Sequence, residues 1–139
     1  MICVLDASVL VALCIPQPAT DASITFLENF LAQDDAALLA PDCIFYETTA
    51  TLRKYERQGI YRGLDEDLLS LYNLPITSIS CRDLMRAAAA ISREHVLSPY
   101  DAFYLALAQR EDAPLITADE RLVNGTKGKG FDVRNVMPA

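Results

Sequence analysis

The stretch "LSPYDAFYLALAQREDAPLITADERL", residues 97–122, predicts a complete helix–strand unit and decides the fold. Pro99 stands where a helix favours proline, in its first turn, and the apolar run "PLIT" (114–117) predicts a buried strand. Two acids interrupt this pattern, because Asp101 lies within an apolar, aromatic run and Asp119 closes the short apolar run of the strand. A segment that only had to be buried would contain neither acid. Both are therefore candidates for function.

The rest of the chain repeats this alternation of short apolar runs and longer helical segments. Strands are expected at 2–5, 37–40, 76–79, 114–117 and near 131–135. Helices are expected at about 7–15, 21–33, 42–58, 64–72, 82–94 and 99–110, with a short one from 119. Strands that alternate with helices predict one α/β domain, with a parallel sheet of about five strands and helices on both faces.

Local signals set the expected ends of two helices. Asp21 and Asp42 are good N-cap residues for the helices that follow them. Gly59 is a good C-terminal residue for the second of these helices.

Composition excludes several classes of protein. With 139 residues, 52% hydrophobic and 22% charged, the chain fits one globular domain. It has no apolar stretch long enough to span a bilayer and no basic segment before its apolar start, so we expect a cytoplasmic protein. Its four cysteines form no C-x-x-C pair, which favours reduced thiols over a zinc site.

Charge is spread unevenly along the chain. The formal net charge is −7, and residues 1–52 contain seven acids and no Lys or Arg. Phosphate repels such a surface, which argues against a protein that coats DNA. It does not exclude an enzyme that binds a phosphodiester through metal ions.

Topology predicts where the acids lie. In a parallel sheet each helix begins at the edge where the strands end. The helix from Asp101 covers about 15 Å, and the next strand returns about 13 Å, so Asp119 comes back to that edge. Asp6 ends the first strand, and Glu47 lies in the first two turns of a later helix. We expect all four carboxylates at the carboxyl edge, where open α/β sheets bind ligands.

Each acid alone also has an ordinary explanation. Acids stabilise helix N-termini, Asp6 can cap a helix from Ala7, and Thr117 and Glu120 have the spacing of a capping box. Four acids at one edge are harder to explain in this way, because clustered carboxylates repel unless they are protonated or bind a cation. Oxygen ligands without His or Cys suit Mg²⁺ or Mn²⁺.

Four motifs resemble those of the PIN-domain family, and within it the VapC-type toxins of toxin–antitoxin pairs. They are "VLDASVLVAL" with Asp6, "PDCIFYETTATLRK" with Glu47, "LSPYDAFYLALAQRED" with Asp101, and "APLITADERL" with Thr117 and Asp119. Together they extend through nearly the whole chain. The resemblance implies a single domain with a three-layer α/β/α sandwich.

The resemblance also implies a metal-dependent endoribonuclease. In such an enzyme, Asp6, Glu47 and Asp101 would hold Mg²⁺ or Mn²⁺, directly or through water, and Asp119 would complete the site. A metal-activated water then attacks the phosphorus of RNA, and the 3′ oxygen leaves. Ser8 and Thr117 either position carboxylates and waters or act as ordinary caps.

The resemblance further implies a homodimer and a small antitoxin protein that lies over the active-site groove. Phe45, Leu52 and Tyr55 are candidate apolar anchors for it, or simply core residues. Candidate cations for the RNA backbone are Arg53, Lys54, Lys127 and Lys129, although the loop with the two lysines can equally be a solvated turn. Tyr100, Phe103 and Tyr104 are stacking residues by type, but their helical spacing favours the core, at least for Phe103.

Other functions fit the sequence less well. A haloacid-dehalogenase-type phosphatase needs a second Asp two residues after the first, where this chain has Ser8. A receiver domain needs paired acids after the first strand, which are missing here. His95 stands at an expected helix end with no Ser or Cys motif to serve. Two alternatives stay open: a solitary RNA-processing nuclease without an antitoxin, and a non-enzymatic acidic binding domain, against which the intact acids weigh.

Overall fold

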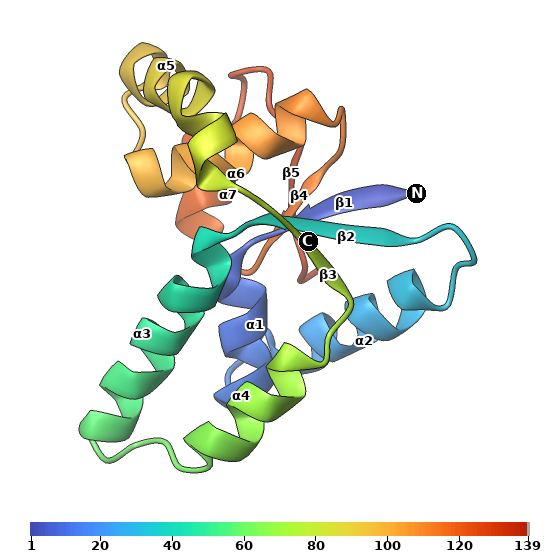
Figure 1. The fold of residues 1–139 in the computed structure, drawn as a ribbon, viewed down its shortest axis with the longest axis vertical. Helices are drawn as coiled ribbons and strands as arrows, with labels where there is room; N and C mark the ends of the chain where they lie inside the picture. Colours follow the sequence, from blue (N-terminus) through green and yellow to red (C-terminus); the bar gives the residue numbers. More distant parts are fainter. Residues whose placement is uncertain (139) are drawn as a thin grey trace.

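The computed structural model describes residues 1–138 and contains one five-stranded sheet, in the order β3-β2-β1-β4-β5 (Figure 1). The strands are β1 (Ile2–Leu5), β2 (Ala37–Pro41), β3 (Ile76–Ile79), β4 (Leu115–Thr117) and β5 (Val133–Asn135). All four pairings between neighbouring strands are parallel. The parallel sheet predicted from the alternating pattern is therefore confirmed.

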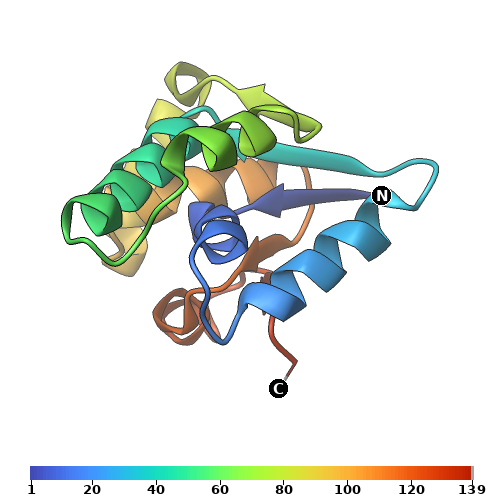
Figure 2. The same cartoon turned by 90° about the horizontal axis from the view of Figure 1, so that it is seen from below.

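Helices cover both faces of this sheet. They are α1 (Ala7–Cys14), α2 (Thr20–Leu31), α3 (Cys43–Arg57), α4 (Leu64–Tyr72), α5 (Met85–His95), α6 (Pro99–Arg110) and α7 (Glu120–Thr126), with a 3₁₀ turn, η1, at Cys81–Leu84. Figure 2 shows α1 and α2 in front of the strands and α6 behind them. The predicted three-layer α/β/α arrangement is confirmed.

Helix α6 forms the centre of one layer. It packs against β1, β2 and β4 on one side and against α5 on the other. A helix covered in this way is apolar around most of its surface, and its buried residues run from Tyr104 to Ala108 without a break. This explains the apolar, aromatic run of the sequence. Asp101, in the first turn, stands where this helix reaches the edge of the sheet.

Two predicted helix caps are wrong in detail. Asp21 is an exposed residue in the first turn of α2, and the N-cap is Ala19, so no side chain caps this helix. Asp42 does precede α3, but its backbone is already helical and its side chain does not cap the helix. Its carboxylate accepts from the backbone N–H of Cys81 (3.0 Å). The N–H of Cys81, in the turn after β3, therefore replaces the helix N-terminus as the partner of Asp42, because β2 and β3 end side by side.

Other local predictions agree with the structure. Gly59 follows α3 with a φ of +77°, a conformation that favours glycine at a helix end. The predicted helix at 82–94 begins with the 3₁₀ turn and becomes regular at Met85. All four cysteines are free, with Cys3 and Cys43 buried. Among residues 1–138, no helix is both long enough and apolar enough to cross a membrane.

Candidate active site

A cleft of about 630 Å³ opens at the carboxyl edge of the sheet, where α1, α3 and α6 begin. The residues that line it are Asp6, Ala7, Ser8, Val11, Gln17, Glu47, Ala50, Thr51, Tyr55, Asp101, Ala118, Asp119 and Arg121. The four acids singled out in the sequence all belong to this lining, although they come from four separate segments. The alternation of strands and helices therefore placed them correctly.

Asp6 is the most buried of the four acids, with 7% of its surface exposed. It caps α1, and its Oδ2 accepts from the backbone N–H of Ser8 and from the hydroxyls of Ser8 and Thr117. Burial raises the pKa of Asp6, and the hydrogen bonds from Ser8 and Thr117 oppose that rise. Within residues 1–138, Oδ1 receives no hydrogen bond. Asp6 thus both caps α1 and lines the cleft.

The hydroxyls of Ser8 and Thr117 connect Asp6, which follows β1, to the loop after β4. The Thr117 hydroxyl donates to Asp6 (2.9 Å) and accepts from the backbone N–H of Asp119 (3.0 Å). The Ser8 hydroxyl accepts from the backbone N–H of Ala118 (2.9 Å) and lies 3.1 Å from the Thr117 hydroxyl. Thr117 is not part of a capping box, because Asp119 itself caps α7. Both hydroxyls instead fix the position of Asp6.

Glu47 has two carboxylate oxygens in different surroundings. Oε2 accepts from the hydroxyl of Tyr104 (2.9 Å). Oε1 is buried and has no hydrogen-bond partner in the described chain. Burial raises the pKa of Glu47, the hydrogen bond from Tyr104 and the nearby Cys43 thiol lower it, and the negative charges of Asp6 and Asp101 raise it. A buried carboxylate oxygen without a partner is costly.

Asp101 and Asp119 are the other two acids of the cleft. Burial raises the pKa of Asp101, the charges of Asp6 and Asp119 raise it further, and Arg121 lowers it. The guanidinium of Arg121 pairs with Asp119, with Nη2 at 3.3 Å from Oδ2, and its side chain is 92% exposed. Sequence reasoning missed Arg121. Its place in the first turn of the helix capped by Asp119 could have suggested it.

The four acids share one cleft, but they do not form a closed ligand set. Among residues 1–138, no three Asp, Glu, His or Cys side chains are grouped so that they could hold a metal ion as they stand. The prediction that the four acids converge is therefore correct at the scale of the cleft. At the scale of one metal site, the acids of the described chain are not, as they stand, grouped as a ligand set.

The lining still suits a hard divalent cation. The negatively charged atoms of the lining that could bind a metal are all carboxylate oxygens. Oε1 of Glu47 is buried without a partner in the described chain, and the acids raise one another's pKa values. A cation would relieve both that repulsion and the unpaired oxygen.

All four basic residues considered for RNA lie outside the cleft. None of Arg53, Lys54, Lys127 and Lys129 lines the cleft. Lys129 donates to the carbonyl of His95 (3.3 Å). The ring of His95 packs edge-on against Phe131, with centroids 5.0 Å apart, so its side chain takes part in packing rather than in the cleft.

The three apolar residues of α3 do not form one row of anchors. Leu52 is fully buried, since α1 packs along α3. Tyr55 lines the acidic cleft. Phe45, 44% exposed, lines a separate apolar groove of about 370 Å³ with residues of α4. The anchor role is therefore wrong for Leu52, for which the alternative of a core residue is confirmed, and Phe45 lies in a groove other than the acidic cleft.

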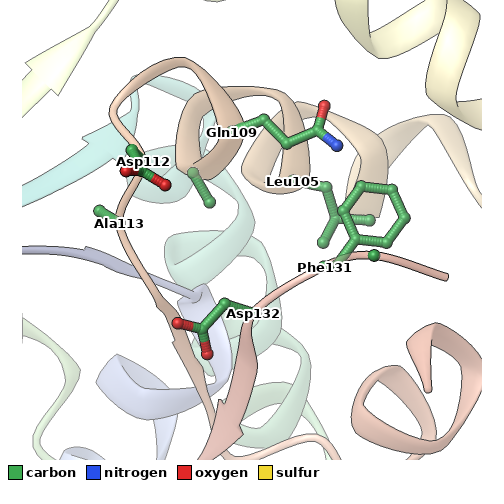
Figure 3. A pocket seen from close by; sticks show the side chains of 8 residues that line it. Leu105, Gln109, Asp112, Ala113, Phe131 and Asp132 are labelled. Carbon is green, nitrogen blue, oxygen red and sulfur yellow. The ribbon is translucent and has the colours of Figure 1, made fainter. Parts of the chain in front are cut away.

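A second acidic pair lies in a small pocket of about 110 Å³ at the opposite edge of the sheet (Figure 3). Asp112 follows α6, and Asp132 precedes β5. Arg134 pairs with Asp132 at 2.9 Å and neutralises it. This pair is separate from the cleft and shares none of its residues.

Comparison with known proteins adds to this geometry. The sequence profile of the PIN domain matches residues 3–127. The ribonuclease VapC3 of Pyrobaculum aerophilum is 28% identical over 124 residues, which cover 86% of this chain and 90% of that protein. A toxin–antitoxin complex from Klebsiella pneumoniae contains a chain with a TM-score of 0.67 and 18% identity, covering 99% of both chains. The sarcin–ricin loop cleaving toxin VapC20 of Mycobacterium tuberculosis has a TM-score of 0.67 and 15% identity, covering 94% of this chain and 96% of that one.

Proposed function

Because the chain belongs to the PIN-domain family, we propose that it is an endoribonuclease that depends on Mg²⁺ or Mn²⁺. The observation that carries the proposal is the single cleft that gathers Asp6, Glu47, Asp101 and Asp119 from four distant segments. Similarity to the ribonuclease VapC3 supports RNA as the substrate, and an RNA substrate agrees with the cytoplasmic location expected from the sequence.

The four acids would hold the cation, directly or through water. When bound, the ion supplies an activated water and neutralises charge that develops on the phosphate. Ser8 and Thr117 keep Asp6 in one position, because both hydroxyls bond to the same oxygen of its carboxylate. Such supporting contacts orient ligands and tune their affinity for metal.

Arg121 is the residue of the cleft best suited to contact the RNA backbone. It is the only cation among the lining residues, and its guanidinium is exposed to solvent beside Asp119, with donors that suit a phosphate. The proposed reaction breaks the bond between phosphorus and the 3′ oxygen and leaves a 5′ phosphate. A water molecule supplies the nucleophile, so no Ser, Cys or His of the chain has to form a covalent bond with RNA.

We further propose that the nuclease is the toxin of a toxin–antitoxin pair and acts as a homodimer. Support for the toxin role comes from the likeness to the Klebsiella pneumoniae complex and to the VapC20 toxin, and the homodimer follows from the family resemblance alone. An antitoxin would block the cleft with a basic segment, since the lining carries four acids and one Arg. A solitary RNA-processing nuclease is the second candidate, because the same cleft serves it equally well.

Sequencing of RNA ends after induction in cells tests the nuclease proposal. Induction of the wild type should create new 5′ phosphate ends at defined sites, and Glu47→Gln should create none. An unchanged RNA pool in the presence of folded protein would overturn the proposal. Co-purification with the product of a small neighbouring gene separates the toxin from the solitary nuclease.

A further inference from the structure

Tyr104 lies one turn after Asp101 on α6, and its side chain is almost completely buried, with 1% of the residue exposed. Burial in the core fixes its ring, because interiors are closely packed. Its hydroxyl donates to Oε2 of Glu47 (2.9 Å), a residue of a different helix that is 57 positions earlier in the chain. The hydrogen bond thus connects a rigid core residue to a cleft acid.

This contact makes the two oxygens of Glu47 unequal. A glutamate side chain has three rotatable bonds, so the helix alone does not set the direction of its carboxylate. The bond from Tyr104 holds Oε2 on the core side, and Oε1 is left buried without a partner in the described chain. A buried polar atom of this kind calls for an explanation, such as an ion that it binds.

We propose that Tyr104 is a positioning residue, which holds Glu47 so that its Oε1 faces the divalent cation. The inference rests on the proposed function and adds a specific role to a residue that does not line the cleft. Tyr104 touches neither cation nor RNA in this role. It acts through Glu47 alone, so its effect should vanish when Glu47 is replaced.

Tyr104→Phe removes only the hydroxyl and keeps the ring. Tyr61→Phe is the matched control, because Tyr61 is also buried and its hydroxyl also donates to a carboxylate, that of Asp67, which does not line the cleft. Both variants lose one partly buried hydrogen bond and should show a lower melting temperature. Only Tyr104→Phe should bind Mn²⁺ more weakly, by about tenfold or more.

The measurement is a Mn²⁺ titration without RNA, in which electron paramagnetic resonance detects the free ion. In the Glu47→Ala background, the further change Tyr104→Phe should leave the remaining Mn²⁺ affinity unchanged. Replacement of Tyr104 by 4-aminophenylalanine, which keeps a donor at the same place, should restore binding.

The outcomes separate the two proposals. If wild type binds Mn²⁺ and Tyr104→Phe binds it equally well, the role of Tyr104 is refuted and the proposed function stands. Failure of 4-aminophenylalanine to restore binding in a folded protein refutes it also, and serves where Tyr104→Phe does not fold. If wild type binds no Mn²⁺ at millimolar concentration, both proposals fail together.

Discussion

At the scale of single residues, the four acids of the cleft differ in what they already bind. Asp6 accepts three hydrogen bonds at one oxygen, and Asp119 pairs with Arg121. Asp101 has no hydrogen bond from another side chain in the described chain, and two neighbouring acids raise its pKa. Its negative charge therefore opposes folding when no cation is bound.

Asp101→Asn should abolish RNA cleavage and preserve the fold. Without metal its melting temperature should equal or slightly exceed that of wild type, because the change relieves carboxylate repulsion. Asp112→Asn is the matched control, since Asp112 is an exposed acid on the same chain segment that lies outside the cleft; it should cleave normally. Cleavage assays with Mn²⁺ and thermal melts measure both effects. Full cleavage by Asp101→Asn would contradict the assignment.

The raised pKa values of Asp6, Glu47 and Asp101 predict how stability depends on pH. A carboxyl group with a raised folded pKa favours folding most when it is protonated, below its ordinary value of 3.8 for Asp or 4.5 for Glu. That contribution is lost as the pH rises through the raised folded pKa.

Without divalent ions, the stability advantage of Asp101→Asn should therefore grow as the pH rises from about 4 to about 7. Melting temperatures of both proteins in EDTA across this range measure it. An advantage that shrinks with rising pH would mean that burial does not raise the pKa of Asp101.

At the scale of helices and strands, the alternating pattern was enough to place each acid at one edge of the sheet. Parallel strands all run in the same direction, so β1 and β4 end at the same edge of the sheet. The positions of Asp6 and Asp119 could therefore be predicted without knowledge of any side-chain contact. The partners of the acids depend on such detail. The contact of Tyr104 with Glu47 joins two helices that are far apart in the sequence, and helical spacing favoured the core for Phe103 without predicting this partner for Tyr104. The hydrogen bond from Cys81 to Asp42 likewise depends on the pairing of β2 and β3.

The link between β1 and the loop after β4 gives a prediction at this scale. Thr117→Val keeps the shape and removes the hydroxyl that bonds Asp6 and Asp119, which should cost about 1–3 kcal/mol of stability and weaken Mn²⁺ binding. Thr126→Val is the control, because Thr126 is also buried but bonds only to its own helix, at the carbonyl of Leu122 (2.8 Å). It should lower stability and leave Mn²⁺ binding intact. Equal Mn²⁺ affinity in both variants, measured by titration, would show that Thr117 has only a structural role.

At the scale of the whole molecule, the cleft should couple metal binding to folding. The four acids are brought together only in the folded chain, so Mn²⁺ should bind that state in preference to the unfolded one. Millimolar Mn²⁺ should raise the melting temperature of the wild type and leave that of Asp101→Asn nearly unchanged. A shift of the same size in both proteins would assign the binding to another part of the surface.

The uneven charge of the molecule predicts how an antitoxin would inhibit it. Residues 1–52 contain seven acids and no Lys or Arg, and the cleft adds Asp101 and Asp119. A partner segment that carries Arg can pair with these carboxylates and compete with the cation. Inhibition by the neighbouring gene product should therefore weaken as salt rises, because ions screen such pairs.

A salt titration of binding and of RNA cleavage, done with the same protein samples, measures this inhibition. Replacement of the partner's arginines by glutamine should remove most of the salt dependence. A neighbour that binds without slowing cleavage, or that inhibits equally at low and high salt, would place its docking surface elsewhere. The apolar groove of Phe45 would then be the surface to test, because apolar contacts do not weaken with salt.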